Sequence, residues 1–131
     1  MDTRRLETAL AWFSLVGAGV HFLLETLYHI QFGQFLPLLL VDYVTVGLLV
    51  YSGTVSLRVR PSSASGLLCG AWGFAACLAY VAFFAHLQVY LQGEAPLFVI
   101  VIIGVALAAA SMAFLLSLRL VAAAMRKAEK D

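Results

Sequence analysis

Three side chains that can transfer protons or bind a metal ion, His21, Glu25 and His29, follow one another at intervals of four residues. In an α-helix this interval places them along one stripe, one turn after another. They stand in a long apolar segment. Ionisable groups are costly inside a membrane and usually face a partner, a cavity or a ligand. The stripe is therefore the first candidate for a functional site.

The apolar segments that must position these groups define the fold class. Of 131 residues, 63% are hydrophobic and 11% are charged, which is typical of a multi-pass membrane protein. A membrane-spanning helix needs about 20 apolar residues. Four stretches meet this requirement: Thr8–Ile30, Phe35–Leu57, Gly66–Leu91 and Pro96–Val121. We predict an all-α, integral membrane four-helix bundle that forms a single domain over residues 1–131.

The basic residues predict how this bundle is oriented. All eight Lys and Arg residues fall on one predicted side of the membrane: Arg4, Arg5, Arg58, Arg60, Arg119, Arg126, Lys127 and Lys130. Basic residues concentrate in cytoplasmic loops, so both termini are expected in the cytoplasm. The membrane would be a bacterial inner membrane or a eukaryotic endomembrane. Membrane lipid is an expected partner, and nucleic acid is not.

Two residues from other spans are expected at the depth of the first stripe. With a rise of ~1.5 Å per residue, Asp42 lies ~10 Å below the outer end of the second span, and His86 lies ~8 Å below the outer end of the third. Two carboxylates and up to three imidazoles then gather in the outer half of the membrane, where no Lys or Arg is available. Glu25 and Asp42 must therefore pair with histidine, be protonated, or meet a cationic ligand or a metal.

Our principal interpretation is an intramembrane pocket for a small lipophilic ligand, cationic or sterol-like. Its predicted lining consists of His21, Glu25, Tyr28, Asp42 and His86. This reading requires no cofactor. The sequence leaves open whether the pocket is catalytic. If it is, a His–Glu pair one turn apart suits acid/base, isomerase-like chemistry on a lipid-soluble substrate.

Two other uses of the same residues remain open. The first is a transition-metal or haem site, with His21, Glu25 and His86 as the candidate ligands. The second is a small proton-coupled transporter or a structural subunit of a larger membrane complex. Transport would require a homo-oligomer such as a dimer, because four spans leave little room for a pathway. The glycine-rich face of the third span, which begins with Gly66 and Gly70, is the candidate contact.

The local sequence around the first stripe resembles the EXPERA family, which includes emopamil-binding sterol isomerases and sigma-2-type receptors. Trp12, Phe13 and Gly17, followed by His21-Phe-Leu-Leu-Glu25, resemble the first helix of that family, and the segment 42–46 loosely resembles the start of its second. The resemblance implies a four-helix module in which His21, Glu25 and Asp42 line a pocket for a lipophilic amine or sterol-like ligand. The segment 47–50 is apolar where the isomerases carry a further acid, so sterol isomerisation itself is not expected.

Overall fold

The computed structural model describes residues 3–33, 35–58, 64–94 and 96–129. Within them the chain forms four α-helices: α1 (Thr3–Phe32), α2 (Leu36–Arg58), α3 (Ser65–Leu91) and α4 (Leu97–Ala128). All four are long and apolar enough to cross a membrane, which confirms the predicted number, order and type of elements. The first and last helices, α1 and α4, extend further than the apolar segments alone predicted, because the Arg, Glu and Lys residues near their ends are good helix formers.

Glycine and proline define the two tight connections. Gly33 and Gly93 follow α1 and α3 with φ angles of 70° and 80°, the left-handed conformation that commonly ends a helix. The N–H of Gly33 donates to the carbonyl oxygen of His29 at 2.9 Å. Pro37 lies in the first turn of α2 and Pro96 caps the start of α4, where a missing N–H costs nothing. Each connection therefore turns the chain sharply back.

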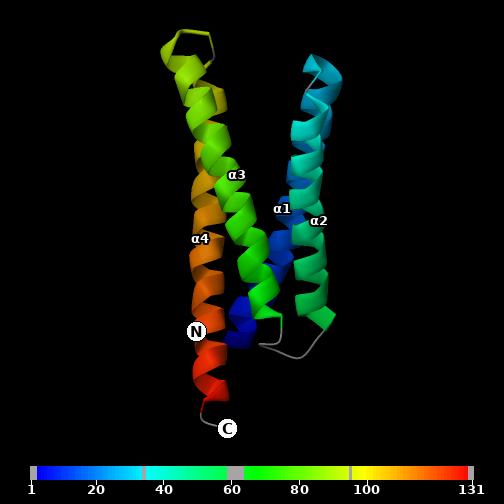
Figure 1. Cartoon of the computed structure of the whole chain (residues 1–131), viewed down its shortest axis with the longest axis vertical. Coiled ribbons are helices and arrows are strands. Elements are labelled where there is room, and N and C mark those ends of the chain that lie inside the picture. The colour runs from blue at the N-terminus through cyan, green and yellow to red at the C-terminus, as the bar shows by residue number, and fades with distance from the viewer. Residues whose placement is uncertain (1–2, 34, 59–63, 95, 130–131) are drawn as a thin grey trace.

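The helices form two hairpins, α1 with α2 and α3 with α4 (Figure 1). Both termini lie at one end of the molecule, which we call the terminal end. The α1–α2 and α3–α4 connections lie at the opposite end, which we call the hairpin end. The two hairpins are close at the terminal end and diverge toward the hairpin end, so that Figure 1 shows the shape of a V.

The buried core follows this divergence. The most buried residues of α1 and α3 belong to the halves near the terminal end: Glu7, Leu10, Ala11, Ser14 and Ala18 in α1, and Ser65, Leu68, Ala71 and Trp72 in α3. In α2 burial extends further, to Asp42 and Leu39, because α1 packs along its whole length. Toward the hairpin end, each helix therefore packs mainly on the other helix of its own hairpin.

One polar contact joins the two hairpins inside the core. The indole Nε1 of Trp72 donates to Ser14 Oγ at 2.9 Å, and the same hydroxyl donates to the carbonyl oxygen of Leu10 at 2.8 Å. The Trp72 ring also stacks on Phe13, with centroids 5.0 Å apart. A buried indole N–H needs such an acceptor, so Ser14 fixes where α3 meets α1.

Small residues allow two other close approaches. A Cβ built on Gly53 of α2 would lie 2.9 Å from the backbone carbonyl oxygen of Ala11, so α1 and α2 are nearly in backbone contact there. In the glycine-rich face of α3, only Gly73 packs on α4, where its Cβ would meet Phe114 at 3.0 Å. A Cβ built on Gly66 or Gly70 would have nothing within 4 Å among the described residues, so no described helix packs closely on that part of the face.

Candidate functional site

Three of the predicted site residues converge in the half of the molecule toward the hairpin end. His21 and Glu25 of α1 and Asp42 of α2 each offer one ligand atom, and these atoms all lie within 4.8 Å of one another. Asp42 is only 8% exposed, whereas His21 and Glu25 are half-buried. The cluster is therefore built entirely on the α1–α2 hairpin, with two donors from one helix and one from its neighbour.

The imidazole of His21 faces the carboxylate of Asp42. Its Nε2 lies 3.5 Å from Asp42 Oδ1, beyond the 2.7–2.9 Å of a charge-assisted hydrogen bond. This nitrogen is buried, and it has no hydrogen-bond partner among the residues that the structure describes. A buried ring nitrogen directed toward carboxylate oxygens can hold a proton or an ion between them.

The residues that follow the three site residues join the two helices at the same depth. Thr26 Oγ1 and the Tyr43 hydroxyl are hydrogen-bonded at 3.0 Å, and the rings of Phe22 and Tyr43 lie 5.5 Å apart. Phe22, Thr26 and Tyr43 each stand one position after His21, Glu25 and Asp42. This second set of contacts fixes the rotation of both helices, and therefore the direction of the site side chains.

The remaining predicted site residues lie outside this group. Tyr28 is 47% exposed, and its ring packs on Phe32 at 5.0 Å. His29 is half-buried and one turn beyond Glu25. His86 belongs to α3, where its Nδ1 lies 2.9 Å from the carbonyl oxygen of Ala82 in its own helix. The metal site was predicted at His21, Glu25 and His86. In the structure Asp42, and not His86, lies beside His21 and Glu25.

Sequence reasoning missed two features. Thr26 was not singled out and Tyr43 was given no role in the site, although each follows a site residue directly. Glu7 was left out because it precedes the first apolar segment, yet it is only 5% exposed. The signal was available, since Glu7 stands two turns before Ser14 on the buried stripe of α1.

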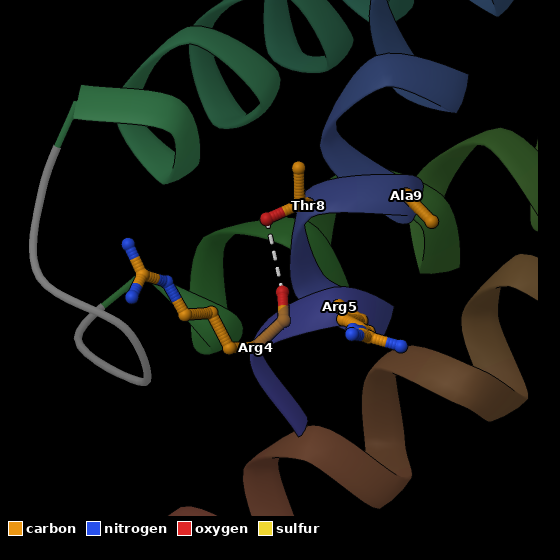
Figure 2. A pocket seen from close by; sticks show the side chains of 4 residues that line it. All are labelled: Arg4, Arg5, Thr8 and Ala9. Carbon is orange, nitrogen blue, oxygen red and sulfur yellow. Dashed lines mark hydrogen bonds between the residues drawn. The ribbon is translucent and has the colours of Figure 1, made fainter. Parts of the chain in front are cut away.

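The opposite end of the molecule is basic. Figure 2 shows an open depression lined by Arg4, Arg5, Thr8 and Ala9, in which the Thr8 hydroxyl donates to the Arg4 carbonyl oxygen at 2.9 Å. Of the other described Lys and Arg residues, Arg58 ends α2, and Arg119, Arg126 and Lys127 belong to the last third of α4, toward the same end. Arg60 and Lys130 fall outside the described residues. No described Lys or Arg accompanies His21, Glu25 and Asp42.

The fold and composition define the class, a multi-pass membrane protein with four spans. No protein-family model, curated protein or solved structure matches the chain. The resemblance to the EXPERA family therefore remains a prediction based on the residues quoted from the sequence.

Proposed function

We propose that this chain is an integral membrane protein that binds a cation at His21, Glu25 and Asp42. One observation carries the proposal: two carboxylates and an imidazole converge within 4.8 Å in apolar spans whose described Lys and Arg residues lie toward the other end. Two carboxylates so close together in a medium of low dielectric need a proton or a cation between them. A cationic ligand satisfies both acids at once.

We further propose that the termini are cytoplasmic, which places this site in the outer half of the bilayer. The support is the charge distribution, because basic residues favour the cytoplasmic side. A ligand arriving from the lipid would meet aromatic surface near the site, since Phe22 and Tyr28 are each nearly half exposed. The ligand class suggested by the sequence, a lipophilic amine or sterol-like ligand, suits such a route.

Thermal unfolding of the purified full-length protein tests the proposal. The panel pairs lipophilic amines with neutral alcohols of the same carbon skeleton and includes divalent metal chlorides. We expect cations to raise the unfolding temperature and the neutral partners to leave it unchanged. Glu25→Gln and Asp42→Asn should each reduce that response, because each removes one of the two charges that the cation neutralises.

Glu94→Gln is the matched control. Glu94 is an exposed acid that follows α3, and it lies outside the cluster of His21, Glu25 and Asp42. Its substitution should leave the response to cations intact. Equal responses from the parent protein, Glu25→Gln and Asp42→Asn would show that no cation is bound at this site.

A further inference from the structure

We infer that the cation is a divalent transition-metal ion of the zinc type, held by His21 Nε2 and one oxygen each of Glu25 and Asp42. This inference rests on the proposed function, because it names the class of cation that the same site takes. Three arguments carry it: the spacing of the donors, the state of the imidazole and the balance of charge.

The spacing of one donor pair, His21 and Asp42, favours a metal ion over an amine. Two donors bound at about 2.1 Å to a tetrahedral zinc ion lie about 3.4 Å apart. Two acceptors that share one ammonium group through hydrogen bonds of about 2.8 Å lie about 4.6 Å apart. The separation of His21 Nε2 and Asp42 Oδ1 is 3.5 Å. That pair is therefore spaced as two ligands of one metal ion.

The position of the imidazole suits coordination. His21 Nε2 is buried and makes no hydrogen bond to any described residue, yet it is directed at a carboxylate oxygen. A neutral imidazole nitrogen with an available lone pair is the commonest protein ligand for metal ions. Imidazole with carboxylate oxygens is a donor set that zinc and neighbouring first-row metals accept.

Charge gives the third argument. Glu25 and Asp42 together carry two negative charges when both are ionised, and a divalent ion balances them. A monovalent ammonium group balances only one of these charges, so the second acid would have to be protonated or paired with histidine. No Lys or Arg lies between Arg5 and Arg58 in the sequence, so α1 carries none beyond its first turn.

The number of protein ligands indicates that one coordination position of the metal ion would be open. Three protein ligands leave the fourth position of a tetrahedral ion for water or an exogenous ligand, unlike the four protein ligands of structural zinc sites. The Thr26–Tyr43 hydrogen bond and the Phe22–Tyr43 contact hold the two helices in the register that the three donors need. Such supporting contacts are what orient metal ligands in proteins.

The test uses the full-length protein, stripped of metal with a chelator and titrated with Co²⁺ as a spectroscopic substitute for Zn²⁺. We expect ligand-field absorption that saturates at one ion per chain and disappears when Zn²⁺ is added. His21→Gln, Glu25→Gln and Asp42→Asn should each weaken Co²⁺ binding by at least about tenfold, because each removes a ligand. His86→Gln, which changes the same residue type on α3, should leave it unchanged.

X-ray absorption of the zinc-loaded parent protein makes the test independent of how the variants fold. One imidazole nitrogen and two or three oxygens at about 2.0–2.2 Å are expected. A sulfur shell would assign the metal to Cys69 or Cys77 and overturn the inference, as would Co²⁺ binding that depends on His86 instead of His21.

The two proposals fail separately. If no metal binds but lipophilic amines stabilise the protein in a manner that depends on Glu25, the metal inference is wrong and the cation-binding function stands. If neither metals nor amines bind, both are wrong.

Discussion

The hydroxyl of Tyr43 is hydrogen-bonded to Thr26 Oγ1 at 3.0 Å, one residue beyond each of the two acids in the candidate site. Tyr43 follows Asp42, and Thr26 follows Glu25. Because neighbouring residues on a helix are separated by a fixed rotation, this bond between α1 and α2 also fixes how the two carboxylates face each other. The hydrogen bond joins the two helices, and in doing so it sets the geometry of the candidate site.

Tyr43→Phe tests this relationship. The variant keeps the ring that packs on Phe22 and removes only the hydroxyl. We expect cation affinity at the site to fall by about tenfold, as for other supporting contacts of metal ligands, and stability to fall by about 0.6 kcal/mol. Titration of the purified protein measures the first quantity and denaturant unfolding in detergent the second.

Tyr51→Phe is the control for that variant, because Tyr51 lies on the same helix and is 59% exposed. It should change neither quantity. Equal affinity in the parent protein and Tyr43→Phe would mean that the hydroxyl does not orient the site.

The contact between Ser14 and Trp72 should hold the two hairpins together. Trp72→Phe keeps an aromatic ring near Phe13 but loses the indole N–H, and Ser14→Ala loses its acceptor. In a double-mutant cycle we expect a coupling of about 0.6 kcal/mol, the usual value for a hydrogen bond between membrane helices. Unfolding of the parent, both single variants and the double variant measures it. Strict additivity would show that the bond contributes nothing to the joining of the hairpins.

Substitution of Gly53 by alanine should destabilise the protein, whereas the same substitution at Gly47 should not. Gly53→Ala would place a methyl group 2.9 Å from the Ala11 carbonyl oxygen, which belongs to the backbone and cannot rotate away. We expect a loss of about 1–3 kcal/mol in the free energy of unfolding, as for other overpacked sites. Gly47 lies on the same helix with nothing within 4 Å of its Cβ position, so Gly47→Ala is the control. Similar stabilities of the two variants would contradict the close approach of α1 and α2.

Single-cysteine labelling tests the orientation. In a chain with Cys69 and Cys77 replaced by Ser, Glu94→Cys reports on the hairpin end and Lys127→Cys on the terminal end. With cytoplasmic termini, a membrane-impermeant maleimide added to intact cells should label the first position only. Labelling at position 127 requires permeabilised membranes. The reverse pattern would place the site in the inner half of the membrane.

Much of the fold could be predicted from the sequence, because membrane spans are specified by local composition. Twenty or so apolar residues in a row have few alternatives to a helix in lipid, and Gly33, Gly93, Pro37 and Pro96 mark where those helices turn. The basic residues of the terminal end likewise predict orientation with no reference to packing. His21 and Glu25 could be placed on one stripe because the helical period alone determines it.

The membership of the site was decided by the tertiary structure. Helical rise placed Asp42 and His86 at similar depths, but depth says nothing about how a helix is rotated or tilted relative to its neighbours. Packing decides both. The close approach at Gly53 brings α2, and with it Asp42, against α1. The Ser14–Trp72 contact joins α3 to α1 near the terminal end, and from there the hairpins diverge, with His86 on the other arm.

The sequence by itself thus determined four apolar helices, their order and the stripe that carries His21 and Glu25, since these follow from hydropathy and the period of the helix. The sequence also placed Asp42 with them in the predicted pocket, but only the tertiary structure showed that these three side chains meet and that Tyr28, His29 and His86 lie outside the cluster. The physical reason is that contacts between helices depend on side chains far apart in the chain, and no local pattern encodes which of them meet.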